Sequence, residues 1–249
     1  MSTGARLEHA RQACSSLARH SLAEVQLPQL PRRTTMITVT VLQAAPGFAR
    51  GLIRDLRVRW ALEEAGLPYD TLPIGQAEQS SAEYRKIQPF GQVPAYRDDQ
   101  VSLFESGAIA LHIAEQSETL LSKHQPERGM AVAWLFAALN TVEPAVSPLV
   151  SIDLFHSHTG WGADCREIYA ERARTRLSQL GAALKGQSWL GPRFTIADLV
   201  MATVLRVLRH TDLVENEAGV ADYLARCEAR PAFKRALARH FAETDCITI

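Results

Sequence analysis

The segments Gln88-Pro-Phe-Gly-Gln-Val-Pro94 and Leu103-Phe-Glu-Ser106 decide the fold of this chain. Val93-Pro94 lies where a short strand begins, and an X-Pro bond at such a place can be cis. A cis bond would hold the backbone of Val93 outward, so that its N–H and C=O can pair with an extended peptide as an added strand does. The first segment therefore predicts a peptide-binding strand end.

Glu105-Ser106 opens an apolar helix predicted over residues 107–114. Helix N-termini bind carboxylates through free N–H groups, and a serine hydroxyl adds a further donor. Glu105 suits an ammonium group. Together with Val93, these residues describe a site for a small peptide that has both an α-amino group and an α-carboxylate. The alternative is that Ser106 is an ordinary N-cap.

The first half of the chain alternates between strands and helices. A β-branched strand, a helix ended by Gly66 and a second strand form a β-α-β unit, which favours parallel strands. A short polar helical stretch, a hairpin and an apolar helix follow. The order is β-α-β-α-β-β-α, with elements predicted over 37–42, 52–65, 69–74, 80–87, 92–96, 101–104 and 107–114.

Strand signals vanish after Pro126, and the second half predicts an all-helical domain. Thr195 and Asp198 have the spacing of a capping box, and the apolar run after them predicts a buried helix. The predicted helices cover 128–143, 164–184, 195–210, 218–230 and 231–242. The expected division is an extension over 1–35, an α/β domain over 36–120 and a helical domain over 127–245. The extension is a disordered tail, a targeting peptide or the result of a start codon assigned upstream of Met36.

Composition excludes several classes of protein. The 249 residues carry 27 basic and 27 acidic side chains, and a net charge of zero argues against a dedicated nucleic-acid binder. The four cysteines are scattered and form no CxxC pair, which indicates neither a disulfide framework nor a zinc site. We find no stretch of ~18 apolar residues in the sequence, so we expect no membrane-spanning helix. We expect a cytoplasmic protein with no metal, nucleic-acid or membrane partner.

The chain resembles the cytosolic glutathione S-transferase family. The motifs that carry the resemblance occur in the family's order: Arg57-Val-Arg-Trp-Ala-Leu-Glu-Glu-Ala-Gly-Leu-Pro-Tyr69, Gln88–Pro94, Leu103–Ser106 and Thr195–Asp198. The resemblance implies a thioredoxin-like α/β N-terminal domain, an all-α C-terminal domain, a homodimer and a role in detoxification. It implies glutathione as co-substrate, bound by Gln92, Val93, Pro94, Glu105 and Ser106.

The chain departs from the family where the glutathione thiol should be activated. Most members use Tyr, Ser or Cys near the first helix, but residues 43–55 contain none of these. The usual position falls at about Leu52 to Arg54. Free N–H groups at the helix N-terminus or the cations Arg54 and Arg50 are the candidate thiolate stabilisers. The alternative is that Arg54, Arg57 and Arg59 form a solvated helix face that pairs with Asp55, Glu63 and Glu64.

The second substrate is expected between the two domains, against the apolar helix. Trp134 and Asn140, with Phe136 and Glu143, are the candidate residues, and core packing is the alternative for the aromatic ones. The leading function is transfer of an alkyl or aryl group to glutathione. A glutathione-dependent disulfide or peroxide reductase fits the missing hydroxyl, and a non-catalytic binding module fits a lost activator.

Overall fold

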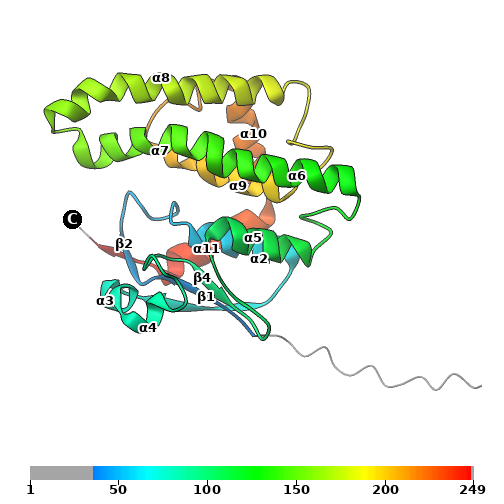
Figure 1. Cartoon of the computed structure of the whole chain (residues 1–249). Helices are drawn as coiled ribbons and strands as arrows, with labels where there is room; N and C mark the ends of the chain where they lie inside the picture. Colours follow the sequence, from blue (N-terminus) through cyan, green and yellow to red (C-terminus); the bar gives the residue numbers. More distant parts are fainter. Residues whose placement is uncertain (1–35, 248–249) are drawn as a thin grey trace, which may run out of the picture. The chain divides into compact units, whose positions relative to one another are not determined.

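The computed structural model describes residues 36–247, so the expectations for residues 1–35 lie outside the described residues. The first part is built on a four-stranded sheet with the order β3-β1-β4-β5, and helices follow it in the second part (Figure 1). The strands are β1 (Ile37–Leu42), β3 (Tyr69–Ile74), β4 (Ala95–Arg97) and β5 (Ser102–Phe104). This is the predicted fold class.

The β-α-β unit forms as the sequence predicts. β1 and β3 pair in parallel, from Ile37 opposite Tyr69 to Leu42 opposite Ile74, and α2 (Asp55–Ala65) connects them. The helix ends where Gly66 adopts a φ of 67°, a left-handed conformation that favours glycine. It begins at Asp55 and not at Leu52, because the preceding residues form turns, with Gly51 at a φ of 77°.

The hairpin and the helix after it position the site. β4 and β5 pair antiparallel, with Ala95 opposite Phe104, and β4 also pairs with β1. The chain then enters α5 (Ser106–Glu115), which packs against α2. The predicted polar helical stretch is two short helices, α3 (Gln76–Ser80) and α4 (Ala82–Arg85).

The helical region differs from expectation in its first element. The structure has a longer helical run there, with two π-helical segments, instead of one helix over 128–143. It consists of α6 (Gln125–Ala137), η2 (Ala138–Val142), α7 (Glu143–Ser151) and η3 (Ile152–His156). The helices α8 (Gly160–Ala183), α9 (Ile196–Leu205), α10 (Ala218–Glu228) and α11 (Pro231–Glu243) follow, with a short 3-10 turn, η4 (Arg206–Leu208), after α9.

Helix α9 is buried along its whole length, as its apolar run predicts. Its capping box is present: the Thr195 N–H donates to Asp198 Oδ2 (2.8 Å), and the Thr195 hydroxyl accepts from the Ala197 N–H (3.3 Å). The box satisfies N–H groups at the helix start that would otherwise be buried without partners.

Two short strands were not predicted. β2 (Ala44–Pro46) and β6 (Asp245–Ile247) pair in parallel, so the expectation that no strand follows Pro126 is wrong at the end of the chain. Three residues are too few to show a strand periodicity. Helix α11 packs against α2, and thus the end of the helical region returns to the α/β part (Figure 1).

The helical run Gln125–His156 is long and apolar enough to cross a membrane by length and composition, with a mean hydropathy of 1.3. Core helices meet the same criteria. The run packs against α8 and α9, which assigns it to the helical bundle.

Candidate functional site

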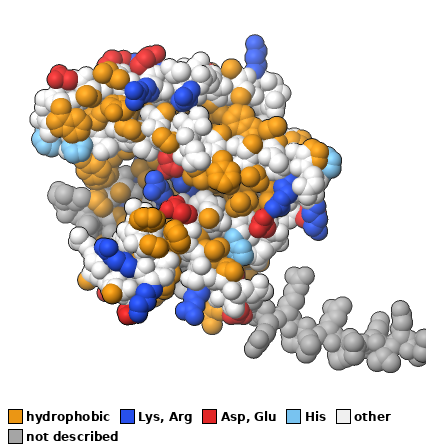
Figure 2. All heavy atoms as spheres, viewed as in Figure 1, with side chains coloured by type: hydrophobic (Ala, Val, Ile, Leu, Met, Phe, Trp, Pro, Cys, Tyr) orange, Lys and Arg blue, Asp and Glu red, His pale blue; other side chains and the backbone are white. Residues whose placement is uncertain are grey.

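A cleft of about 550 Å³ opens between α2 and α5 on one side and the run from α6 to α7 on the other. Figure 2 shows acidic and basic side chains together in the middle of this face, with hydrophobic side chains around them. The cleft is lined by Arg54, Arg57, Glu105, Ser106, Gly107, Ala108, Leu111, Leu135, Phe136, Leu139, Asn140, Glu143, Pro144 and Ser147. Six residues that the sequence singled out for the site therefore line one cavity: Arg54, Glu105, Ser106, Phe136, Asn140 and Glu143.

The β4–β5 hairpin brings the two predicted binding motifs to the same end of the sheet. Because Ala95 lies opposite Phe104, the residues just before Ala95 and those just after Phe104 are neighbours. The Val93-Pro94 bond is cis, as predicted. The N–H and C=O of Val93 form no hydrogen bond with any described residue, whereas the C=O of Gln92 accepts from the Tyr84 hydroxyl (2.7 Å).

Glu105 precedes α5 with a backbone conformation that is rare for a residue with a side chain. Its φ is 68° and its ψ is 112°. Such a conformation costs about 1–3 kcal/mol and is found most often at functional sites. Glu105 is exposed, and Ser106, the first residue of α5, is buried. The N-cap is Glu105, so the interpretation of Ser106 as an ordinary N-cap is wrong.

Gly107 sets the distance between the two walls of the cleft. A Cβ atom built on Gly107 would lie 2.4 Å from Leu139 Cδ1. A side chain at this position would require the Leu139 side chain to move, so glycine allows α5 and the π-helical segment η2 to approach each other closely.

A buried arginine connects the walls. Arg57 Nη1 donates to Ser106 Oγ (3.3 Å), Nε donates to the Thr203 hydroxyl (2.9 Å), and Nη2 donates to Glu143 Oε1 (3.0 Å). Burial lowers the pKa of Arg57, and the attraction of Glu143 opposes that effect. Burial would raise the pKa of Glu143, but Arg57 and then Arg54 hold it below its ordinary value. Arg57 is thus fixed by one residue from each of three other helices.

Arg54 is the accessible cation of the cleft. Its Nη2 donates to the same Glu143 Oε1 (3.0 Å), while its side chain is 52% exposed. Two guanidinium groups therefore share one carboxylate beside the turn before α2. Arg50 points elsewhere: its Nη2 donates to the Phe241 C=O (2.6 Å), and its guanidinium lies over the Phe241 ring.

The prediction of a solvated arginine face on α2 is wrong. Arg57 is 3% and Arg59 0% exposed. Arg59 does pair with Asp55 (2.6 Å), but its second partner is Glu243 on α11. Glu63 and Glu64 pair with Arg235 and Arg230 of the helical region, instead of with their own helix.

Residues from the end of the chain hold the turn that precedes α2. The Gly51 N–H donates to His240 Nε2 (3.0 Å), and Arg206 Nη2 donates to the Gly51 C=O (3.2 Å). Arg209 Nη2 donates to the C=O groups of Phe48 and Arg50, both at 2.8 Å. His240 is fully buried, and its Nδ1 lies 3.2 Å from Asp55 Oδ2. This turn includes Leu52 to Arg54, where the resemblance places the side chain that activates the thiol.

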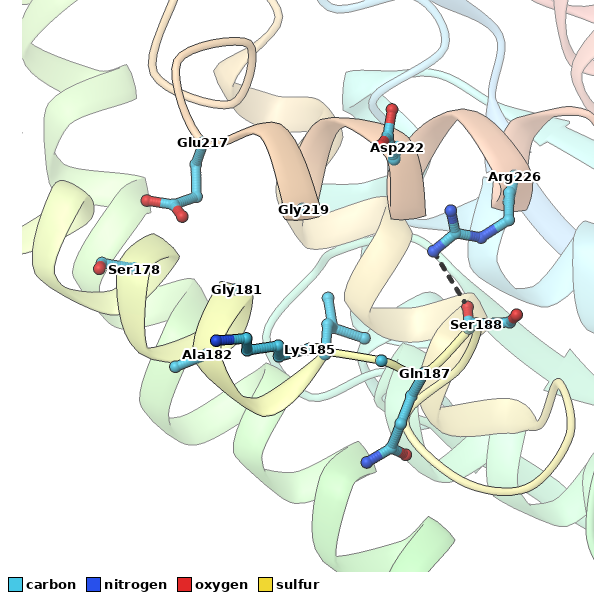
Figure 3. A pocket seen from close by; sticks show the side chains of 12 residues that line it. Ser178, Gly181, Ala182, Lys185, Gln187, Ser188, Glu217, Gly219, Asp222 and Arg226 are labelled. Atoms are coloured by element: carbon cyan, nitrogen blue, oxygen red, sulfur yellow. Dashed lines mark hydrogen bonds between the residues drawn. The ribbon is translucent and has the colours of Figure 1, made fainter.

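A second cavity, of about 590 Å³, lies between the end of α8 and α10 (Figure 3). Its wall is mostly polar and includes Lys185, Glu217, Asp222 and Arg226, of which Arg226 donates to the Ser188 C=O (3.4 Å). None of the residues that the sequence predicts for the site lines it. The predicted site residues therefore gather in the first cleft and not in this cavity.

Residues 49–115 match the family model of the glutathione S-transferase N-terminal domain. A glutathione S-transferase of Zea mays is 38% identical over 57% of this chain and 70% of its own length. A disulfide-bond oxidoreductase of Escherichia coli is 30% identical over 71% of this chain and 86% of its own length. The chain belongs to the glutathione S-transferase family.

The fold of the family is also found in solved structures. A glutathione transferase family member from Pseudomonas fluorescens, with two glutathione molecules bound, superimposes with a TM-score of 0.72 at 26% identity. The match covers 83% of this chain and 94% of that one. As in other members of the family, a thioredoxin-like domain is followed by a helical domain.

Of the residues expected to line the second-substrate pocket, Phe136, Asn140 and Glu143 line the cleft, but Trp134 packs half-buried against the core. The structure also adds two residues that sequence reasoning missed as parts of the site, Arg57 and His240. The sequence spacing predicts Arg57 on a solvated helix face, and no sequence pattern singles out His240. The burial of Arg57 has no signal in the spacing of α2, because its partners Glu143 and Thr203 lie 86 and 146 residues away.

Proposed function

We propose that this protein is a glutathione transferase, which binds glutathione in the cleft and directs its thiolate at a small, apolar, electrophilic second substrate. One observation carries the proposal. The hairpin end combines the unpaired backbone of Val93 with Glu105 and Ser106 at the start of α5, and Arg54 lines the same cleft.

Each end of glutathione has a partner of matching chemistry. The N–H and C=O of Val93 pair with the cysteinyl unit, next to Gln92 and Pro94 in the hairpin. The Ser106 hydroxyl and the first N–H groups of α5 bind the γ-glutamyl carboxylate, because a helix N-terminus favours a negative charge. Glu105, exposed at the mouth of the cleft, binds the γ-glutamyl ammonium group.

The reaction is a substitution at the second substrate. The glutathione sulfur, as thiolate, attacks the electrophilic carbon and forms a C–S bond. The bond to the leaving group breaks, the leaving group keeps the electron pair, and the thiol proton goes to solvent. Leu111, Leu135, Phe136 and Leu139 give the cleft an apolar wall that binds the body of this substrate.

The thiolate is stabilised without a hydroxyl group of the protein. Arg54 supplies positive charge, since it shares Glu143 with Arg57. The N–H groups of Ile53, Arg54 and Asp55, at the start of α2, donate to no described residue and add positive potential. Arg50 is held by Phe241 outside the cleft, so its charge is not directed at the thiolate.

A second candidate reaction is glutathione-dependent disulfide reduction. The observation in its favour is that residues 43–55 contain no Ser, Thr, Tyr or Cys, and this reaction needs none. Glutathione thiolate attacks a mixed disulfide of glutathione, glutathione disulfide forms, and the other thiolate leaves. The disulfide-bond oxidoreductase of E. coli, at 30% identity, gives this candidate support.

The proposal includes a homodimer in the cytoplasm that takes part in detoxification, with domains over 36–120 and 127–245. Family membership supports the dimer, and so does Phe90, which is 65% exposed and packs edge-on against Phe104. An exposed aromatic pair of this kind suits contact with a second subunit.

Binding to immobilised glutathione, followed by turnover of an aryl halide and of a mixed disulfide of glutathione, tests the proposal. We expect retention on the resin and faster turnover of the halide. Faster turnover of the disulfide would favour the reductase. Absence of binding at millimolar glutathione would contradict both and leave a non-catalytic module.

A further inference from the structure

The cleft continues into a groove that the proposed function does not use. This groove, of about 470 Å³, lies between η2, the start of α7 and α8. Asn140 and Pro144 line both the cleft and the groove, so the two cavities meet at these residues. The remaining lining residues are Thr141, Ala145, Arg172, Thr175 and Arg176.

Positive charge dominates the wall of the groove. Arg172 and Arg176 lie four residues apart on α8, which places them on one face of the helix. No acidic residue lines the groove, and neither arginine forms an ion pair with a described carboxylate. The Arg172 guanidinium lies over the Tyr169 ring at 5.2 Å, and Arg176 Nη1 donates to Gln179 Oε1 (2.7 Å).

The arginine between them behaves differently. Arg174 points away from the groove and pairs with Glu167 and with Glu171 (3.0 Å) on α8 itself. Its charge is compensated within the helix. Arg172 and Arg176 therefore differ from their neighbour both in direction and in the lack of an acidic partner.

The π-helical segment η2 presents a polar side chain where the groove meets the cleft. Asn140 is exposed, and its amide forms no hydrogen bond with a described residue. π-helical segments often occur at functional sites, because the extra residue changes the direction of a side chain. The amide of Asn140 is thus available to a molecule that extends from the cleft into the groove.

We propose that the second substrate carries a carboxylate, which Arg172 and Arg176 bind while its apolar, electrophilic part lies in the cleft. The planar guanidinium group matches a carboxylate with paired hydrogen bonds. Asn140 and the Thr141 and Thr175 hydroxyls supply further donors. The inference rests on the proposed function, in which the reacting carbon lies near Arg54. It specifies the substrate class as apolar electrophiles with a carboxylate distant from the reacting carbon.

Two conjugates that differ in one charge test this inference by binding alone. S-(4-carboxybenzyl)glutathione is the product of glutathione and 4-(chloromethyl)benzoate, formed as the thiolate displaces chloride. The conjugate in which this benzoate alone is methylated has nearly the same shape and no carboxylate on the benzyl group. Isothermal titration calorimetry should show that the double variant R172Q/R176Q binds the acid about 5- to 20-fold more weakly than the unaltered protein does. The ester should bind both proteins equally.

Arg174→Gln is the control, since it removes one guanidinium charge from the same helix outside the groove. We expect no change in the affinity of either conjugate. The preference for the acid should also diminish as the salt concentration rises, because Arg172 is exposed and Arg176 is only half-buried. In R172Q/R176Q, kinetics with 4-(chloromethyl)benzoate and its methyl ester should show a loss of kcat/KM for the acid alone.

Glutathione disulfide, which brings a second glutathione with its own carboxylates, distinguishes two sources of the carboxylate. Weaker binding of both the disulfide and the acid conjugate by R172Q/R176Q would identify a second glutathione unit as an occupant of the groove. Weaker binding of the acid conjugate alone would identify a carboxylated acceptor.

Two results would overturn the inference. In the first, both conjugates bind, and the double variant binds neither more weakly or binds both more weakly by the same factor. The groove then does not recognise the carboxylate, but the proposed function stands. If neither conjugate nor glutathione binds the unaltered protein, the proposed function fails and the inference fails with it.

Discussion

The two halves of the cleft are assembled from different parts of the chain. Val93 and Ser106 lie at the end of one hairpin, and the pairing of β4 with β5 alone makes them neighbours. Gly51, in the turn before α2, is held by Arg206 and His240, which follow it by 155 and 189 residues. The half proposed to bind the peptide is thus local in sequence, and the half proposed to face the thiol depends on the helical region.

The halves also differ in how they present charge. The hairpin half offers a backbone, a hydroxyl and one exposed carboxylate. The thiol half has no hydroxyl but two arginines that share Glu143. Arg57 connects the halves, because it contacts Ser106 in one and Glu143 in the other. Substitutions along this connection should separate folding, peptide binding and thiol activation.

The largest effect is expected from Arg57→Met. It removes the partner of a buried carboxylate and leaves Glu143 with Arg54 alone, and loss of one partner of a buried pair costs about 3–5 kcal/mol. Urea unfolding should show this loss in the free energy of unfolding. Thr203→Val, which deletes only the bond to Arg57 Nε, should cost about 1 kcal/mol. Equal stability of the two variants would show that the ion pair does not join the halves.

The next largest effect is expected from Ser106→Ala. The variant keeps the fold but loses a hydroxyl donor to the γ-glutamyl carboxylate. A hydrogen bond to a charged group contributes about 1.5–3 kcal/mol, so glutathione should bind at least about tenfold more weakly in calorimetry. Ser102→Ala, on the exposed face of β5, is the control and should leave the affinity unchanged. An unchanged affinity in Ser106→Ala would remove this residue from the site.

The difference between the halves also explains what could be predicted from the sequence. The strands, Gly66, the capping box and the hairpin follow from local patterns of turn residues and hydrophobicity, and so does the position of Glu105 and Ser106 at the start of a helix. The interactions that hold the turn before α2 could not be predicted, because its hydrogen-bond partners lie on η4 and α11.

The arginines on α2 show the same limit of prediction from the sequence. The spacing of Arg57 and Arg59 with acidic residues of their own helix is typical of a solvated face. Both side chains are instead buried, since α9 and α11 cover the helix. Sequence spacing identifies possible partners within a helix but contains no information about which elements will pack on it.

Arg54→Ala should have a smaller effect, confined to the thiol. A cation within reach favours the thiolate, and the exposure of Arg54 weakens its influence, so we expect the pKa of bound glutathione to rise by about one unit. A titration of thiolate absorbance in the complex measures it. Arg50→Ala should leave that pKa unchanged, because Arg50 interacts with Phe241 outside the cleft. An equal shift in both variants would assign the effect to the turn's conformation.

The smallest effect concerns pH. Arg57 and Arg54 hold the pKa of Glu143 below its ordinary value despite burial, so the folded state favours the charged form more than the unfolded chain does. The stability from this group is therefore full above the ordinary pKa of a glutamate, about 4.3, and is lost as the pH falls through the lower pKa of the folded state. Glu143→Gln keeps an oxygen that accepts from both arginines but cannot be protonated. Its free energy of unfolding should decline less steeply than that of the unaltered protein below about pH 4.3. Glu83→Gln, in an exposed pair with Lys86, is the control and should leave the pH dependence of the free energy of unfolding unchanged. An equally steep decline in Glu143→Gln and in the unaltered protein would exclude the Glu143 carboxylate as the acid-sensitive group.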